Sequence, residues 1–176
     1  MSAISDAEIH RGRGAGISPQ GRFARTHSET FDDGWDIPEE VSPLKTQVLA
    51  DESRTILAKN ESPDIPFSVS INAYRGCEHG CIYCFARPNH AYRGLSPGLD
   101  FETKIFVKPS AAALLEKELR KKDYSPKPVA LGANTDPYQP VERQLGITRA
   151  VLEVLERFGH PVTIVTKSAL VLRDGC

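Results

Sequence analysis

Three closely spaced cysteines are the residues of this sequence most able to do chemistry. Cys77, Cys81 and Cys84 stand in the stretch RGCEHGCIYCFARP, at a C-x3-C-x2-C spacing. Thiolates are soft ligands that hold iron–sulfur clusters and zinc. Three thiolates leave one iron of a cubane cluster without a protein ligand, so that another molecule can bind there. The spacing therefore predicts a [4Fe–4S] cluster with one open iron position.

A zinc site and a set of unligated buried thiols are the alternatives. Structural zinc usually takes four ligands in two pairs, and no second cysteine pair follows. His79 lies inside the three-residue gap, where the wrapped loop hinders simultaneous ligation. The fourth cysteine, Cys176, is the last residue of the sequence and is interpreted as an exposed thiol. A cluster is favoured over both alternatives, since free thiols crowded on a loop are prone to oxidation.

The motif and the phrases around it resemble a known superfamily. C-x3-C-x-aromatic-C after a first strand, with Tyr83 at the aromatic position, resembles the radical S-adenosylmethionine superfamily over residues 67–168. The phrases INAYRGCEHGCIYCFARPNHAYRG, LSPGLDFETKIFVK and GANTDPYQPVE resemble the spore photoproduct lyase-like bacterial members. The resemblance implies the N-terminal part of a partial (β/α)6 barrel. It also implies a lyase-like enzyme that cleaves S-adenosylmethionine reductively to a 5′-deoxyadenosyl radical, which acts on an unknown substrate.

The same resemblance implies which side chains meet S-adenosylmethionine. Tyr83 is expected near the adenine, and polar residues at two strand ends near the methionyl group, because parallel strands present their sites at their carboxyl ends. These strand-end residues are Asn134, Thr135, Asp136, Lys167 and Ser168. Thr135 and Asp136 are equally consistent with a turn at Pro137, and Lys167 with a solvated lysine. A one-electron donor such as flavodoxin or ferredoxin is the implied partner. A non-catalytic iron–sulfur or zinc binding module is the alternative function.

The elements that position these residues follow from hydrophobic periodicity. Residues 67–74 alternate apolar and polar side chains and predict a strand immediately before the cysteines. Residues 129–133 and 161–166 predict two further buried strands. Helices are predicted after Ser110, a candidate N-cap, and over residues 147–158, with Gly159 as the stop. The order β, loop, α, β, α, β predicts an α/β fold with parallel strands.

The remaining sequence and its composition limit the other possibilities. Residues 1–42 predict a largely disordered polar tail, 43–66 an extended arm on the core, and 67–176 a truncated radical S-adenosylmethionine core. The RGRG at residues 11–14 is interpreted as solvated, with an RNA-contacting arm as the alternative. A net charge of −1 gives no broad positive field, and a nucleic-acid substrate stays open.

The location and completeness of the chain are also predicted. No stretch approaches the roughly 20 apolar residues of a membrane span, and no secretory leader is visible, so we expect a reducing cytoplasm and no membrane. The sequence ends soon after the third predicted strand, about half-way through the implied barrel. We therefore expect a fragment, or a half-barrel completed by a partner, with weak activity alone and self-association through an open sheet edge.

Overall fold

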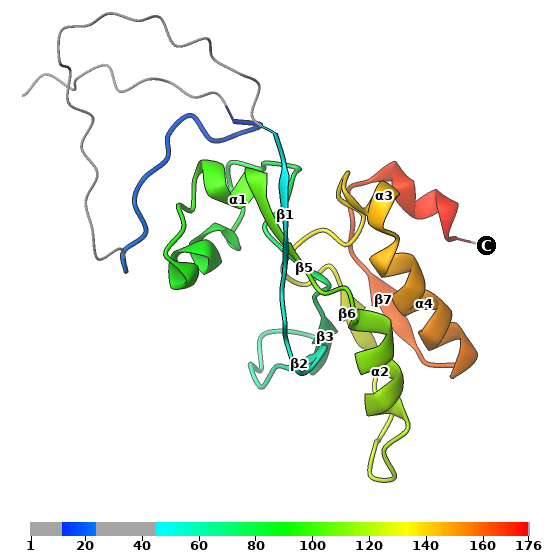
Figure 1. Cartoon of the computed structure of the whole chain (residues 1–176). Helices are drawn as coiled ribbons and strands as arrows, with labels where there is room; N and C mark the ends of the chain where they lie inside the picture. Colours follow the sequence, from blue (N-terminus) through cyan, green and yellow to red (C-terminus); the bar gives the residue numbers. More distant parts are fainter. Residues whose placement is uncertain (1–11, 24–44, 176) are drawn as a thin grey trace, which may run out of the picture.

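The computed structural model describes residues 12–23 and 45–175, and they form a mixed α/β structure with two open sheets (Figure 1). The α/β class that the sequence predicted is confirmed, but the arrangement it predicted, part of a partial barrel of parallel strands, is not found among the described residues. Both sheets instead mix parallel and antiparallel pairs, and neither closes into a barrel within the described residues. The antiparallel strands are β2, which the periodicity did not predict, and β4, which the prediction did not separate from β3.

The larger sheet contains the three strands that the sequence predicted. Its order is β2 (Leu57–Lys59), β3 (Val69–Ile71), β6 (Val129–Leu131) and β7 (Val162–Ile164). β3, β6 and β7 are parallel, whereas β2 is antiparallel to β3. The connection from β2 to β3 contains no helix. A loop can join antiparallel neighbours, whereas parallel neighbours need a longer crossover connection, usually a helix. β7 pairs only with β6 and is an edge strand among the described residues.

The smaller sheet lies beside the loop that carries the cysteines. Its order is β1 (Gln47–Ala50), β5 (Lys104–Val107) and β4 (Tyr74–Arg75), with β1 parallel and β4 antiparallel to β5. The strand predicted over residues 67–74 is therefore confirmed at Val69–Ile71 but is wrong in its length. The chain divides it into β3 and β4, which belong to different sheets.

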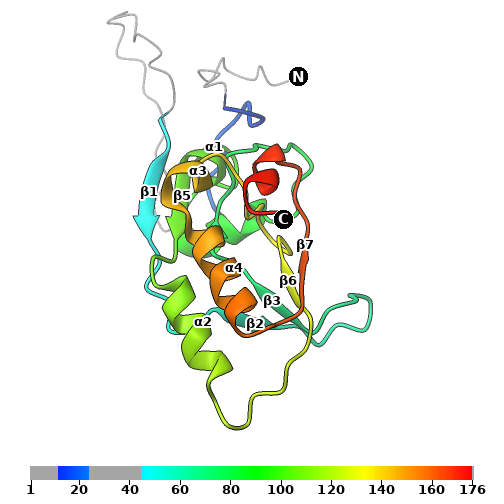
Figure 2. The same cartoon turned by 90° about the vertical axis from the view of Figure 1, so that its right-hand side faces the viewer.

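Two helices cover one face of the larger sheet, and their buried sides pack with the strands in the main core (Figure 2). α2 (Ala111–Leu119) and α4 (Ile147–Arg157) pack against each other. Leu115 and Val151 are fully buried, and burial of such side chains stabilises the fold by about 1.5–3 kcal/mol each. Ser110 occupies the N-cap of α2 as predicted, but its side chain makes no capping hydrogen bond. Gly159 ends α4 with φ +57°, as predicted.

Four shorter helices lie near the carboxyl ends of the parallel strands of the larger sheet (Figure 1). They are η1 (Arg87–Arg93), α1 (Leu99–Thr103), α3 (Glu142–Leu145) and η2 (Ala169–Arg173). η1 and α1 contact each other and follow the cysteines. Arg173 of η2 pairs with the buried Glu142 of α3 at 3.1 Å. The strand ends and the cysteine loop are therefore held by several independent contacts.

Parts of the predicted arm and tail can also be placed. The arm predicted at residues 43–66 contains β1 and β2. Of the predicted tail, only residues 12–23 are described; residues 1–11 and 24–42 lie outside the described residues, and so does Cys176. Within the described part of the chain, no helix has the length and apolar character needed to cross a membrane.

Candidate metal centre

The three cysteines lie on one loop between β4 and η1, where tight turns bring them together. Gly76 precedes Cys77 with φ +82°, and a side chain there would place its Cβ 2.9 Å from the Phe101 carbonyl oxygen. The Cys77 amide donates to the same Phe101 oxygen at 2.9 Å. The Cys84 amide donates to the Cys81 carbonyl oxygen at 3.2 Å. Backbone geometry, and not a disulfide, therefore sets the positions of three free thiols.

The thiols differ in their surroundings. Cys77 is buried against Ala86 and Phe101, with Cys84 packed at the side of this small cluster. Cys81 and Cys84 are half-buried. Burial raises the pKa of the Cys77 thiol to about 11. Metal binding would have to displace this proton, so we expect proton release when the site is loaded.

A buried glutamine that follows β6 in the sequence holds the backbone around the first cysteine. The Gln139 side chain is fully buried, and its Oε1 accepts from the Glu78 amide at 2.9 Å. Its Nε2 donates to the Gly76 carbonyl oxygen at 3.2 Å. Gln139 thus bonds the backbone on both sides of Cys77. Gln139 was not predicted as a site residue, although it belongs to the GANTDPYQP phrase that carried the resemblance.

An ion pair holds the second cysteine. The Arg87 guanidinium donates to the carbonyl oxygens of Cys81 and Gly80 at 2.9 Å and 3.0 Å. It also pairs with Glu102, whose side chain is fully buried. A buried carboxylate needs such a partner, because an unpaired charge away from water is costly. Neither Arg87 nor Glu102 was predicted as a site residue.

The site residues predicted at the end of β6 make hydrogen bonds to other residues of the chain. The Thr135 hydroxyl donates to the Tyr74 carbonyl oxygen at 2.8 Å, and Asn134 accepts from Asn89 at 3.1 Å. Asp136 accepts from the Thr166 hydroxyl at 2.7 Å and from the Lys167 amide at 2.9 Å. Burial raises the pKa of Asp136, but the nearby His79 ring, 3.4 Å away, and the hydrogen bonds from Thr166 and Lys167 outweigh it and bring the pKa to about 2. These contacts favour the turn interpretation of Thr135 and Asp136.

Lys167 and Tyr83 come together at the cysteine loop, as a shared site would require. Lys167 Nζ lies 2.8 Å from the Cys81 sulfur and 3.2 Å from the Tyr83 hydroxyl. These hydrogen bonds raise the pKa of Lys167 above its ordinary value. Tyr83 is 80% exposed, which leaves a face of its ring open to a ligand. Ser168, by contrast, caps η2: its hydroxyl accepts from the Leu170 amide at 3.3 Å.

The donor set fits an iron–sulfur cluster by its chemistry. Among the described residues, no group of three Cys, His, Asp or Glu side chains could hold a single metal ion. A cubane cluster bonds each thiolate to a different iron, so its ligands need not converge on one point. Cys77, Cys81 and Cys84 are the residues that would hold it.

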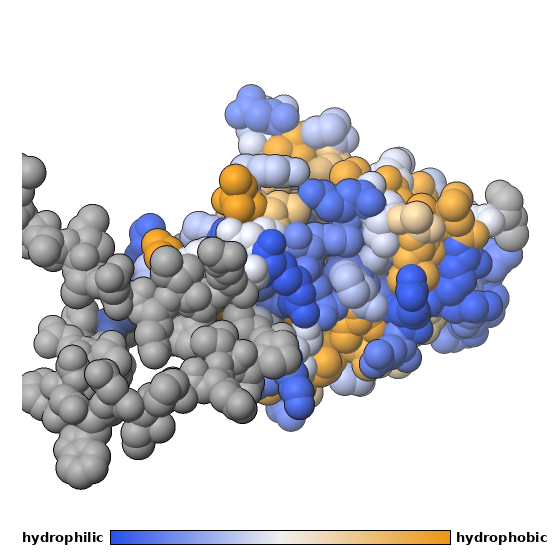
Figure 3. Space-filling model, turned by 90° about the horizontal axis from the view of Figure 1, so that it is seen from above, coloured by the Kyte–Doolittle hydropathy of each residue, from blue (hydrophilic) through white to orange (hydrophobic). Residues whose placement is uncertain are grey.

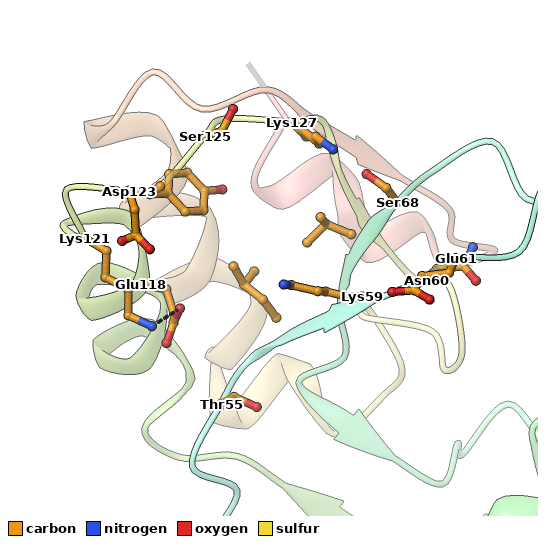
Figure 4. Close-up of a pocket in the computed structure, with 13 residues that line it drawn as sticks. Thr55, Lys59, Asn60, Glu61, Ser68, Glu118, Lys121, Asp123, Ser125 and Lys127 are labelled. Carbon is orange, nitrogen blue, oxygen red and sulfur yellow. Dashed lines mark hydrogen bonds and ion pairs between the residues drawn. The ribbon is translucent and has the colours of Figure 1, made fainter.

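A pocket of about 640 Å³ lies at the opposite end of the sheet (Figure 4). It is bounded by Ser68 and Val69 at the start of β3 and by Lys127 before β6, whereas the cysteine loop follows the carboxyl ends of the strands. Charges of both signs line it, and Glu118 pairs with Lys121 at 2.7 Å. It contains no cysteine, so we assign it no part in the metal centre.

Comparison with known proteins gives relatives without a stated function. An uncharacterized protein of Mycobacterium tuberculosis is 44% identical over 120 residues, which is 66% of this chain and 35% of that protein. An uncharacterized Mycobacterium bovis protein matches equally well. One of Methanocaldococcus jannaschii is 30% identical over 105 residues, or 59% of this chain and 37% of that protein. The chain thus spans about a third of the length of these relatives. No family model and no solved structure matches it.

Proposed function

We propose that this chain is the cluster-binding part of a radical S-adenosylmethionine enzyme resembling spore photoproduct lyase-like proteins. The observation that carries the proposal is the meeting of the cysteine loop with the end of β7, where Lys167 contacts both Cys81 and Tyr83. An open-iron cluster needs neighbours that can position a charged cofactor, and a lysine beside an exposed aromatic ring supplies both charge and a stacking surface.

The bound cluster would supply one-electron reduction of S-adenosylmethionine and release of a 5′-deoxyadenosyl radical, which acts on a substrate still to be identified. The protein positions the reactants and excludes water. Cys77, Cys81 and Cys84 hold the cluster. Lys167 offers its ammonium group to the methionyl carboxylate, and Tyr83 offers its ring to the adenine. Asn134, Thr135, Asp136 and Ser168 support the strand ends through their hydrogen bonds.

The proposal extends to the fold, the partner and the location. β3, β6 and β7, joined by the crossover helices α2 and α4, would be the first βα units of a partial (β/α)6 barrel. A complete barrel would need further strands, and the 120 residues that match the Mycobacterium tuberculosis relative are only 35% of that protein. A flavodoxin or ferredoxin in a reducing cytoplasm would supply the electron.

Metal content of anaerobically purified protein tests the ligand set. We expect about four iron and four sulfide per chain, and loss of both when Cys77, Cys81 or Cys84 is changed to Ala. Cys176→Ala is the matched control and should leave iron content unchanged. Iron loss in the control as large as in Cys84→Ala would show that the ligand set is wrong. Stoichiometric zinc that resists exchange with iron would instead support a zinc binding module and contradict the proposal.

A further inference from the structure

Residues 12–21 lie against the cysteine loop, although they are separated from it by more than fifty positions in sequence. The Arg13 guanidinium donates to Thr46 Oγ1 at 2.7 Å and to Glu78 Oε1 at 3.3 Å. It also donates to the Glu102 carbonyl oxygen. Thr46 precedes β1, and Glu78 follows the first cysteine directly. One side chain of this segment therefore joins β1, α1 and the cysteine loop.

The buried carboxylate of Glu102 connects this segment to the second cysteine. Its Oε2 accepts from the Gly14 amide at 3.0 Å, and its Oε1 from the Ala15 amide at 2.8 Å. The same carboxylate pairs with Arg87, which bonds the Cys81 and Gly80 carbonyl oxygens. Removal of the two amides would leave a buried charge less satisfied, and such a loss is expensive. The segment thus supports the ion pair that fixes the loop.

The backbone of residues 12–21 approaches the cysteine loop so closely that Gly14 cannot carry a side chain. A Cβ on Gly14 would lie 1.8 Å from the Gly80 carbonyl oxygen, which belongs to the cysteine loop. Backbone cannot move aside as a flexible side chain can. A Cβ on Gly16 would meet nothing within 4 Å. The two glycines therefore provide a matched pair for experiment.

The contact continues along the chain beyond the cysteines. A Cβ on Gly98 would lie 2.2 Å from the Ile17 carbonyl oxygen. Gly21 is buried, and a Cβ there would lie 3.0 Å from the Leu95 carbonyl oxygen. In Figure 1 this segment, coloured blue, runs beside α1. Residues 12–21 thus contact the segment from the cysteine loop to α1 at several successive positions.

We propose that residues 12–21 form a strap that holds the cysteine loop in its ligating conformation. Arg13, Gly14 and Ala15 act as positioning residues through Glu78, Glu102 and Arg87, and they contact no reacting group. In this respect the inference deepens the proposed function and rests on it. Its physical core, that the strap keeps the loop closed, concerns the protein alone and can be tested without a cluster.

The test compares Gly14→Val with Gly16→Val in iron-free protein. Each cysteine is alkylated with iodoacetamide, and the rate at each site is read by peptide mass spectrometry. Cys77 is buried, so its alkylation requires the loop to open. We expect alkylation of Cys77 to be about tenfold faster in Gly14→Val and unchanged in Gly16→Val. Equal rates in the two variants would overturn the proposal.

Hydrogen exchange of backbone amides shows whether Gly14→Val opens only the cysteine loop or destabilises the whole fold. Amides of α4, remote from the strap in sequence, should stay protected in Gly14→Val while those of residues 77–87 exchange faster. If Gly14→Val loses protection throughout, Arg13→Gln replaces it, since this change removes the charged contacts to Glu78 and Thr46 without a steric clash. Faster alkylation of Cys77 in Arg13→Gln is then required, and an unchanged rate would contradict the strap.

A second experiment tests whether the strap slows the loss of iron from a bound cluster. In iron-loaded protein, we expect iron transfer to a chelator to be about threefold faster or more in Gly14→Val than in Gly16→Val. Failure of both proteins to bind iron would contradict the proposed function and leave the alkylation result to decide the strap. Iron binding with equal release rates and equal alkylation would contradict the strap and leave the proposed function standing. The two failures are thus distinguishable.

Discussion

Lys167 is the residue at which the cysteine loop and the sheet meet. Its ammonium nitrogen contacts the Cys81 sulfur at 2.8 Å and lies 5.4 Å from the centre of the Tyr83 ring. It is exposed, so these contacts contribute little to stability. These contacts matter because they place the Lys167 ammonium group beside the proposed cluster site. From there the flexible side chain can leave Cys81 and Tyr83 and bind the carboxylate of a ligand.

Lys167→Met tests this residue. We expect iron content to stay as in the unmodified chain and affinity for S-adenosylmethionine to fall about tenfold, as loss of a charge-assisted hydrogen bond predicts. Lys127→Met, at the far pocket, is the control and should change neither quantity. Isothermal titration under anaerobic conditions measures the affinity. An unchanged affinity in Lys167→Met would remove this lysine from the site.

The sequence identified the residues that act through local spacing and missed those that act across the fold. Three cysteines on one loop are visible because their separation is short. Gln139 and Glu102 are invisible because their contacts to the loop join residues far apart: Gln139 to Glu78 spans 61 positions, and Glu102 to Gly14 spans 88. Only the tertiary structure shows that their buried side chains hold the backbone beside Cys77 and Cys81.

At the scale of elements, the close approach of β6 and β7 depends on Gly132. Its φ is +85°, and a Cβ there would lie 2.0 Å from the Val165 carbonyl oxygen. Gly159 has φ +57° but open space around its Cβ position. Both glycines tolerate a backbone conformation that other residues avoid, and only Gly132 also faces a steric clash.

Gly132→Ala should therefore destabilise the fold much more than Gly159→Ala. We expect about 1 kcal/mol for Gly159→Ala from backbone strain, and more than about 3 kcal/mol for Gly132→Ala, which must separate β6 from β7. Urea unfolding followed by circular dichroism measures both. Similar losses in the two variants would show that the backbones at Gly132 can move apart freely.

His90 of η1 gives the fold a pH dependence. Burial lowers its pKa, although a hydrogen bond between its Nε2 and the Lys104 carbonyl oxygen at 3.0 Å opposes this effect. In the unfolded chain the pKa is about 6.5, so as the pH falls below that value the unfolded chain binds a proton that the folded chain refuses. Stability should consequently decrease with acidification.

His90→Gln isolates this contribution. The free energy of unfolding of the iron-free chain should fall less steeply below about pH 6.5 in the variant than in the unmodified chain. The glutamine amide can retain a hydrogen bond to Lys104, so the comparison concerns the proton. Parallel pH profiles, measured by urea unfolding at several pH values, would contradict neutral burial of His90.

Periodicity predicted the elements that have a long repeating pattern and failed for those defined by pairing. α2, α4, β6 and β7 appear where apolar spacing placed them. β1 is mostly exposed, and β4 has only two residues, so neither has a face that alternation could reveal. Both are strands because β5 lies between them, and β5 itself was not predicted. Pairing partners distant in sequence leave no local signal.

For the whole molecule, the exposed edge at β7 is the main feature. Val165 follows β7 and is 68% exposed, and no described strand pairs on that side. The view from above in Figure 3 shows hydrophobic residues in separate patches between hydrophilic ones. An open strand with apolar neighbours is a template for pairing with another chain. We therefore expect the chain to self-associate through this edge.

Val165→Lys should reduce that self-association, because a charge at a strand edge opposes pairing. Leu172→Lys is the control: it introduces the same charge at a residue that is 79% exposed and belongs to η2 and not to a strand. Light scattering across a concentration series should show a smaller average mass only for Val165→Lys. A monodisperse monomer in the unmodified chain, or an equal effect of both changes, would contradict association through β7.

The proposed function requires the open iron of a cluster on this loop to bind S-adenosylmethionine. Electron paramagnetic resonance of the dithionite-reduced, iron-loaded chain, recorded with and without S-adenosylmethionine, can detect this binding. We expect the signal of a reduced [4Fe–4S] cluster and a change in its g values when the cofactor is added, since the cofactor's amino and carboxylate groups would bind the open iron. A cluster signal that S-adenosylmethionine leaves unchanged at saturating concentration would rule out this function and identify a non-catalytic iron–sulfur module instead.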